Sequence, residues 1–154
     1  MRVFSLSKKK FSHDLSGKGA ELAGGRWNSK GKAVLYTSQS RALCTAEIAV
    51  HTPLGNIPRD YEIVEINVPD SILSIDEIEI TELPIDWKSI PHSHASQEIG
   101  DKFLSENKFL VFKVPSVVVL GEFNFLINPA HRRFNEVEIT SIDPFEFDVR
   151  LFLK

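Results

Sequence analysis

Short runs with β-strand character fill the second half of the chain, and they constrain its fold more than any other feature. Each run is rich in Val, Ile and Phe, residues that pack well on a pleated sheet. Segments containing Pro, Gly, Asn or Asp separate the runs, and these residues end strands and form turns. The runs are residues 109–114, 117–120, 123–127, 137–142 and 145–147. A sheet of short strands is therefore expected.

Two segments have the apolar spacing of helices that pack on such a sheet. Residues 40–51 begin with Ser40 as a candidate N-cap and stop before Pro53. Glu47 lies at the edge of an apolar stripe along this helix, formed by Ala42, Leu43, Ala46, Ala49 and Val50. Residues 93–106 predict a second helix, although Gly100 is a poor helix former.

The first half of the chain adds further strands and a long loop. Strands are expected at residues 1–6, 33–37 and 61–68, and an edge strand or short turns at 69–83. Residues 8–31 are rich in Gly, Ser and Lys and predict a long loop, and such loops are usually functional in compact domains. Together these elements predict one α+β domain over residues 1–154, with one or two helices packed on the sheet.

Bulk properties exclude several classes of protein. A net charge of −3 argues against a dedicated nucleic-acid binder, which normally carries a basic surplus. The single cysteine, Cys44, excludes an internal disulfide and suits a reducing compartment. No apolar run has the length of a signal peptide or a membrane span. We therefore expect a cytoplasmic protein that binds neither membrane nor nucleic acid directly.

The stretch AGGRWNSKG, residues 23–31, combines three glycines with a cation and a large aromatic ring. Glycines let the backbone approach a ligand closely, and the guanidinium of Arg26 matches the geometry of phosphate oxygens. It is equally possible that Arg26 has a structural role and holds this loop in place through an ion pair with a nearby carboxylate. The local sequence does not choose between a binding role and a structural role.

For three other residues the sequence likewise allows either a structural role or a functional role. Glu47 is either a surface glutamate whose methylene groups pack beside the core or a partly buried acid with a catalytic role. Tyr36 ends a strand, where tyrosines are usually core aromatics, and Ser116 follows Pro115, where a serine can cap a bulge. His92 and His94 lack a Cys or a nearby acid that would complete a ligand set, so no metal site is expected.

The ordered set of motifs resembles the RES domain family. The motifs are GKGA (17–20), GGRWN (24–28), VLYTS (34–38), TAE (45–47), VPS (114–116), FLINP (125–129) and FEFDVRLF (145–152). The resemblance implies an ADP-ribosyltransferase-like fold with a mixed β-sheet core and a few packed helices. It also implies an NAD⁺-degrading toxin that cleaves the nicotinamide–ribose bond, with water or phosphate as acceptor. Its implied partner is an Xre-type antitoxin, as in a type II toxin–antitoxin system.

Carried over residue by residue, the resemblance assigns a site on this chain. It implies catalytic roles for Arg26, Tyr36, Glu47 and Ser116, and NAD⁺ contacts for Arg2, Arg26, Tyr36 and Asn128. Glu47 would stabilise positive charge on the ribose, Tyr36 would stack on nicotinamide, and Ser116 would bond its amide or the ribose. Trp27 would anchor the loop in the core. Residues 53–105 match the family only loosely.

Two alternatives remain open at this point. One keeps the chemistry and changes the acceptor, so that ADP-ribose is transferred to a protein. The other is a non-catalytic binding module in which Arg26 and Glu47 form a structural ion pair.

Overall fold

A computed structural model describes residues 1–153 and shows a seven-stranded mixed sheet carrying three α-helices. The strand order is β4-β5-β6-β2-β1-β3-β7, and all neighbours are antiparallel except β4 and β5. The strands are β1 Arg2–Lys8, β2 Leu35–Ser38, β3 Tyr61–Asn67, β4 Ile75–Glu77, β5 Val111–Pro115, β6 Phe123–Ile127 and β7 Glu138–Phe145. The helices are α1 Lys18–Ala23, α2 Arg41–His51 and α3 His94–Glu106. The expected α+β class with a mixed sheet is confirmed.

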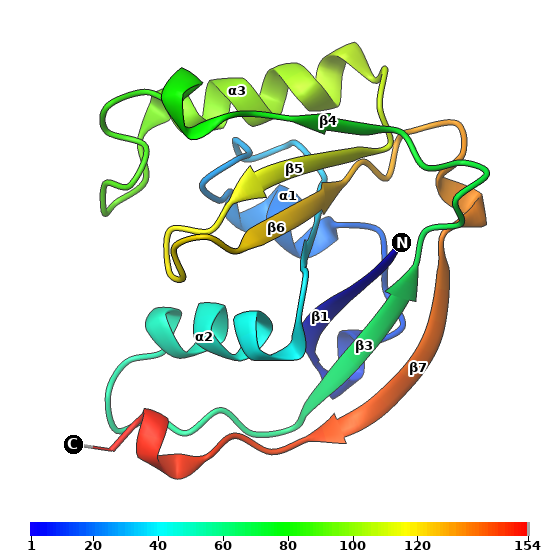
Figure 1. Cartoon of the computed structure of the whole chain (residues 1–154). Coiled ribbons are helices and arrows are strands. Elements are labelled where there is room, and N and C mark those ends of the chain that lie inside the picture. The colour runs from blue at the N-terminus through cyan, green and yellow to red at the C-terminus, as the bar shows by residue number, and fades with distance from the viewer. Residues whose placement is uncertain (154) are drawn as a thin grey trace.

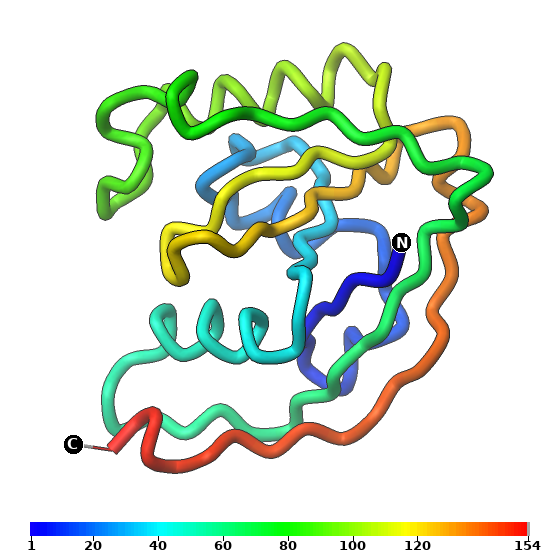
Figure 2. Tube along the Cα trace, in the orientation of Figure 1, coloured from blue at the N-terminus to red at the C-terminus, as the bar shows by residue number. Residues whose placement is uncertain are grey.

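The elements form two groups around the short central strand β2 (Figure 1). In one group α3 lies along β4 and β5, and in the other β3 and β7 run side by side beyond β1. Helix α2 packs against β1 and β2. The tube in Figure 2 shows the end of the chain returning to the segment after α2, where the amide of Gly55 donates to the carbonyl of Phe152 at 2.8 Å.

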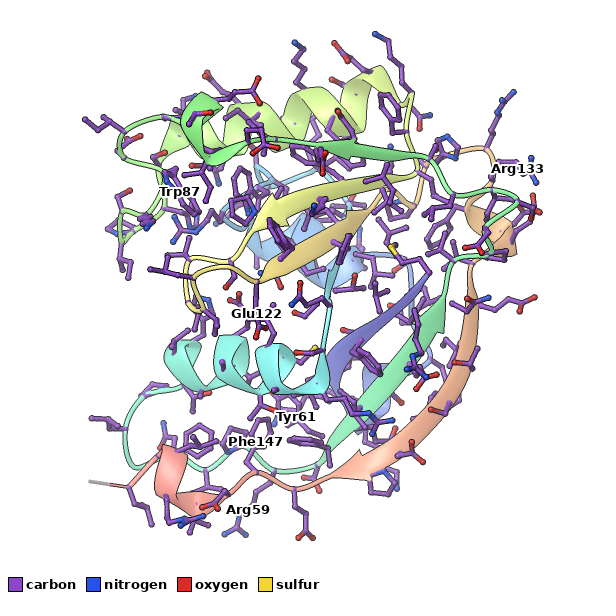
Figure 3. All side chains as sticks on the ribbon, in the orientation of Figure 1. Arg59, Tyr61, Trp87, Glu122, Arg133 and Phe147 are labelled. Carbon is purple, nitrogen blue, oxygen red and sulfur yellow. The ribbon has the colours of Figure 1, made fainter. Side chains whose placement is uncertain are left out.

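Two large apolar clusters fill the interior. One joins the central strands, with Val3, Leu35, Ile66, Val111 and Ile127 among its buried members. The other packs α3 and the loop before β2 on β5 and β6, with Trp27, Val34, Trp87, Phe103, Phe112 and Leu126. Near the C-terminus, Phe147 packs edge-on against Tyr61 with ring centroids 5.4 Å apart (Figure 3). These contacts fix the last segment on β3.

Both predicted helices are confirmed, as is the predicted N-cap Ser40, and Ser93 caps the second helix in the same way. The hydroxyl oxygen of Ser40 accepts from the amide of Leu43 at 3.0 Å, and that of Ser93 accepts from the amide of Ser96 at 3.2 Å. Each bond satisfies an amide that the first helical turn leaves without a partner. Within residues 1–153, the helices are too short and too polar for any of them to cross a bilayer.

Several predicted boundaries were wrong. Residues 117–120 are not a strand, because the Ser116 hydroxyl accepts from the amides of Val118 and Val119 and turns the chain toward β6. The long loop at 8–31 contains the short helix α1. The two runs at 137–142 and 145–147 meet in one strand, β7, which extends through Pro144. Proline is tolerated there because β7 is an edge strand.

The apolar stripe predicted for α2 was wrong at both ends, where Ala42 and Val50 are exposed. Val50 is 59% exposed, whereas Cys44, Glu47, Ile48 and His51 face a cavity. The reason is that this part of α2 lies against an open space rather than a packed core. Apolar periodicity identifies a helix face only where that face packs on apolar neighbours.

Candidate active site

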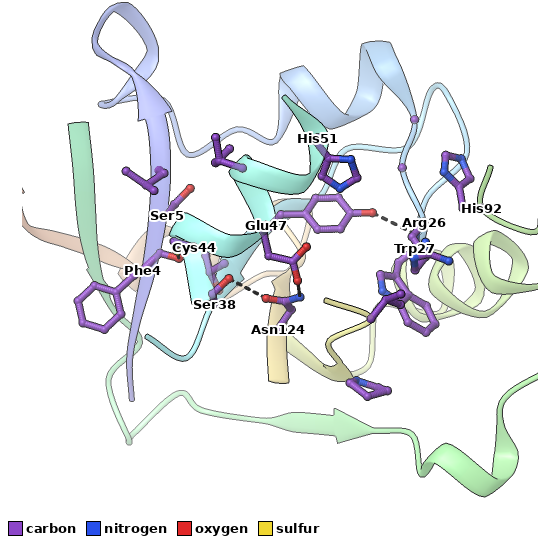
Figure 4. Close-up of a pocket in the computed structure, with 18 residues that line it drawn as sticks. Phe4, Ser5, Arg26, Trp27, Ser38, Cys44, Glu47, His51, His92 and Asn124 are labelled. Atoms are coloured by element: carbon purple, nitrogen blue, oxygen red, sulfur yellow. Dashed lines mark hydrogen bonds between the residues drawn. The ribbon is translucent and has the colours of Figure 1, made fainter. Parts of the chain in front are cut away.

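A cavity of about 530 Å³ lies between α2, the loop of residues 24–28 and strands β1, β2 and β6 (Figure 4). Its volume is within the range of small-molecule sites, about 300–1,000 Å³. The walls include Arg26 and Trp27 from the loop, Tyr36 and Ser38 from β2, Glu47 and His51 from α2, His92, and Asn124 from β6. Three residues proposed from the sequence, Arg26, Tyr36 and Glu47, therefore share one cavity.

The 24–28 loop is anchored by two buried residues, Trp27 and Asn28. Trp27 is 3% exposed and packs edge-on against Phe112, with ring centroids 6.3 Å apart. Asn28 is fully buried, and its side-chain amide donates to the carbonyls of Ala20 and Lys32 at 2.8 and 3.0 Å. The anchoring role expected for Trp27 is confirmed.

Helix α3 holds the same loop from its other side. The side-chain amide of Gln97 donates to the backbone carbonyls of Gly25 and Asn28 at 3.0 and 3.1 Å. One turn later, the carboxylate of Asp101 accepts from the amide of Ser29 at 2.9 Å. These bonds satisfy backbone groups that a glycine-rich loop would otherwise leave unpaired. The loop is thus fixed by a helix in the segment that matches the family only loosely.

Gly100 lets α3 approach the loop this closely, and its substitution gives a first prediction. A Cβ at position 100 would lie 1.8 Å from the carbonyl oxygen of Trp27. Gly100→Ala should therefore lower the free energy of unfolding by about 1–3 kcal/mol or more, as overpacking does. The measurement is chemical denaturation. Gly19→Ala is the matched control, because Gly19 is also helical but has open space around it. Equal stability of Gly100→Ala and wild type would contradict this account.

Arg26 lines the cavity while its guanidinium binds backbone. It donates to the carbonyl of Trp87 and, through both terminal nitrogens, to the carbonyl of Ser89 at 3.2 Å. Burial lowers the pKa of the guanidinium, and the nearby carboxylate of Glu47 partly offsets that effect. Arg26 stays a cation at neutral pH. The predicted alternative of a tie to a carboxylate was wrong, since the acceptors in residues 1–153 are carbonyls.

Tyr36 connects β2 to the loop through its hydroxyl. The hydroxyl donates to the side-chain oxygen of Asn28 at 2.8 Å and accepts from the amide of Trp27 at 3.1 Å. Burial raises the pKa of Tyr36 well above its ordinary value. The phenol is therefore protonated, and its hydroxyl is occupied by hydrogen bonds to the loop, so only the ring is available to a ligand.

Glu47 is held by one of its two carboxylate oxygens. Oε1 accepts a hydrogen bond from the hydroxyl of Ser116 at 3.0 Å and another from the side-chain amide of Asn124 at 2.7 Å. The second oxygen, Oε2, accepts no hydrogen bond from any residue between 1 and 153. Ser116 is 1% exposed and receives the amides of Val118 and Val119, so its one proton goes to Glu47. Ser116 therefore lies behind Glu47 and is not part of the cavity wall.

Two further titratable groups on the wall are uncharged at neutral pH. The pKa of His92 is lowered by burial, and then by electrostatic repulsion from Arg26 and His51. Burial raises the pKa of Cys44 to about 11. Its thiol donates to the carbonyl of Phe4 at 3.2 Å. Cys44 is thus a buried thiol and not a thiolate nucleophile.

Two residues proposed to contact NAD⁺ are not brought to this cavity. The Arg2 side chain is 68% exposed on β1 and lies 3.7 Å from the carboxylate of Glu65. Asn128 is 1% exposed, and its amide donates to the carbonyl of Leu104 and the side chain of Asn107. Its position locks the end of β6 against the end of α3. His131, three residues further along the chain, accepts from the backbone amide of Arg133 through Nδ1.

Several residues of the wall were not predicted from the sequence. Asn124 had a visible signal, because a polar residue inside the apolar run FNFLI is unusual in a strand. His51 also had one, because it lies one helical turn after Glu47 and so shares its face. His92 was considered only as a metal ligand and Ser38 only as the last residue of the motif VLYTS, because the folded chain alone brings them to the cavity. Residues 1–153 contain no cluster of three or more His, Cys, Asp or Glu placed to hold a metal ion.

Comparisons with known proteins agree on one family. The family model described as the RES domain matches residues 1–149. A "Prs ADP-ribosylating toxin" from Sphingobium sp. (strain YBL2) is 37% identical over 154 residues, which cover 99% of this chain and 96% of that protein. A "Toxin Res" from Yersinia enterocolitica is 35% identical over 88% of this chain and 89% of its own length.

A solved structure supports the fold. The crystal structure of the M. tuberculosis MbcT–MbcA toxin–antitoxin complex contains a chain that superposes with a TM-score of 0.72. The match covers 98% of this chain and 86% of that chain, at 19% sequence identity. At that identity the likeness establishes the α+β architecture alone.

Proposed function

This chain belongs to the RES domain family, and on that premise we propose that it is the toxin of a bacterial toxin–antitoxin pair. We propose further that it cleaves NAD⁺ at the nicotinamide–ribose bond. The observation that carries this proposal is the composition of one cavity, which combines the free carboxylate oxygen of Glu47 with the cation of Arg26. The names of its relatives, "Prs ADP-ribosylating toxin" and "Toxin Res", support the same class of function.

The cavity has features that suit a dinucleotide. Arg26 keeps N–H groups that its bonds to Trp87 and Ser89 do not use, and guanidinium N–H groups pair well with phosphate oxygens. The ring of Tyr36 and the side chains of Ile48 and Val117 provide apolar wall for flat rings. These groups would hold the pyrophosphate and one ring of NAD⁺ in the same cavity as Glu47.

The proposed reaction breaks the bond between C1′ of the ribose and the ring nitrogen of nicotinamide. The electron pair of that bond stays with the nitrogen and neutralises the positive ring, while positive charge develops on the ribose. Glu47 accepts a hydrogen bond from a ribose hydroxyl through Oε2 and stabilises that charge electrostatically. An oxygen of the acceptor then bonds to C1′ and loses its proton to solvent.

The hydrogen bonds of the site modify two of the roles implied by the family resemblance. The single proton of Ser116 is donated to Glu47, so Ser116 positions the carboxylate instead of bonding nicotinamide. The hydroxyl of Tyr36 is committed to the loop, which leaves ring stacking as its contact with NAD⁺.

The second candidate function is transfer of ADP-ribose to a protein, and one observation favours it. The relative that is 37% identical is named as an ADP-ribosylating toxin of Prs. The first step is the same, so only the acceptor differs. NAD⁺ labelled in its adenylate half separates the possibilities when it is incubated with phosphate, with Prs or with neither. Label in ADP-ribose indicates water, label in ADP-ribose phosphate indicates phosphate, and label on Prs indicates the transferase.

Expression in bacteria tests the toxin and its partner. We propose an Xre-type antitoxin as the inhibitor, and the toxin–antitoxin complex among the structural relatives supports a protein partner. Cells that express the chain alone should stop growing, and their NAD⁺ should fall if the acceptor is water or phosphate. Co-expression of the neighbouring open reading frame should restore growth. Normal growth at a confirmed soluble level of the chain alone would contradict the toxin assignment.

A further inference from the structure

A chain of side-chain hydrogen bonds leads across the sheet to Glu47. The hydroxyl of Ser38 on β2 donates to Oδ1 of Asn124 on β6 at 2.6 Å. The Nδ2 of Asn124 then donates to Oε1 of Glu47 on α2 at 2.7 Å. Figure 4 shows these two bonds as dashed lines between the three residues. Asn124 on β6 therefore connects β2 to α2, the helix that follows β2 in the chain.

The chemistry of these groups permits only one direction for the chain. An ionised carboxylate can only accept, so Asn124 must present its NH₂ group to Glu47. Its carbonyl oxygen then faces Ser38, whose hydroxyl supplies the proton. A flipped Asn124 amide would place its oxygen against the Glu47 carboxylate and lose that bond, and its NH₂ group would then have to donate to the Ser38 hydroxyl. Ser38 is 5% exposed, so water does not easily replace its donation.

The consequence is a carboxylate with one occupied oxygen and one free oxygen. Oε1 receives both Asn124 and Ser116, whereas Oε2 has no partner among residues 1–153. A glutamate on a helix has several rotatable bonds, and fixing them costs conformational entropy that a reaction would otherwise have to supply. Two donors on one oxygen fix the side chain before substrate arrives.

We propose that Asn124, held in place by Ser38, is a positioning residue that presents Oε2 of Glu47 to the ribose of the substrate. This inference rests on the proposed function. Asn124 acts through Glu47 and has no direct part in bond cleavage. It sets which oxygen of the carboxylate is free, and the hydrogen bond from Ser38 holds the other end of the Asn124 amide.

The kinetic test uses three substitutions and one control. Asn124→Ala should lower kcat for nicotinamide release by about 10-fold or more, because a charge-assisted hydrogen bond is lost, while KM changes little. Asn124→Asp should lower kcat further, because it places a carboxylate against Glu47. Ser38→Ala should have a smaller effect of the same kind. Gln39→Ala is the control: its side chain also joins β2 to β6, by accepting from the amide of Phe123 at 3.0 Å, but does not contact Glu47.

A double substitution separates positioning from a general structural effect. If Asn124 acts through Glu47, then Asn124→Ala should cost almost nothing further in a Glu47→Gln protein. The same fold-loss in both backgrounds would overturn the proposal. So would a wild-type kcat for Asn124→Ala, or a loss in Gln39→Ala as large as that in Asn124→Ala.

Crystal structures of wild type, Asn124→Ala and Ser38→Ala give a readout that does not depend on activity. We expect a single conformer of the Glu47 carboxylate in wild type and more than one conformer in Asn124→Ala. A Glu47 carboxylate that keeps the wild-type position and both oxygen environments in the two variants would overturn the proposal. If wild type releases no nicotinamide, the proposed function fails, and these structures still decide whether Asn124 positions Glu47.

Discussion

Glu47→Gln should lower the turnover of NAD⁺ by about 10²-fold or more, which is the usual cost of losing one electrostatic partner of a transition state. Gln keeps the shape of the side chain and can still bond a ribose hydroxyl. It lacks the negative charge that would stabilise a positive ribose. The measurement is nicotinamide release under saturating NAD⁺, with protein stability followed by thermal unfolding.

The control for this change is Glu98→Gln. Glu98 is also a helical glutamate, on α3, but its side chain is 66% exposed and, among residues 1–153, pairs with His94 alone. The Glu98→Gln variant should turn over NAD⁺ at the wild-type rate. Full activity in Glu47→Gln would remove Glu47 from the mechanism, and the proposed function would lose the group that carries it.

Arg26→Ala should weaken NAD⁺ binding by about 10- to 100-fold, the range expected for lost hydrogen bonds to a charged group. Pyrophosphate contacts are made in both the ground state and the transition state, so KM should rise more than kcat falls. Arg26→Lys should restore only part of the affinity, because an ammonium cannot reproduce the planar fork of a guanidinium. Calorimetric titration of NAD⁺ measures the change directly.

The hydrogen bonds from Arg26 to the carbonyls of Trp87 and Ser89 offer a second explanation, a purely structural role for Arg26. The titration of NAD⁺ distinguishes this structural role from a binding role. If Arg26 only ties that turn to the loop, its loss should lower stability and leave NAD⁺ affinity at the wild-type value. Arg133→Ala is the control, because Arg133 is bonded to the carboxylate of Glu136 and does not line the cavity. Its NAD⁺ affinity should not change.

The sequence predicted those parts of the fold that local chemistry decides. Ser40 and Ser93 begin the two long helices because a hydroxyl can bond the first free amides. The run FNFLI becomes β6 with the expected limits. The prediction failed at residues 117–120, where β-branched residues form a turn because the Ser116 hydroxyl bonds two backbone amides. Local propensity does not include that bond.

The candidate site was only partly predictable, because long-range packing decides which residues meet. Gly100 counted against α3 in the sequence, yet its missing side chain is what lets Trp27 pack on that helix. Conversely, the motif residues Arg2 and Asn128 are not in the cavity wall. Asn124 and Ser38 reach Glu47 only because β2 and β6 pair with Ser38 opposite Asn124. Neither residue could be assigned to Glu47 before that register was known.

The central claim is that this chain breaks the nicotinamide–ribose bond and that Glu47 makes it do so. Release of free nicotinamide from NAD⁺ by the purified protein tests this claim most directly, because it precedes every choice of acceptor. The account predicts nicotinamide release by wild type in proportion to enzyme concentration, and at least about 10²-fold slower release by Glu47→Gln. Absence of release by folded wild-type protein, with water, phosphate and Prs each supplied as acceptor, would contradict it.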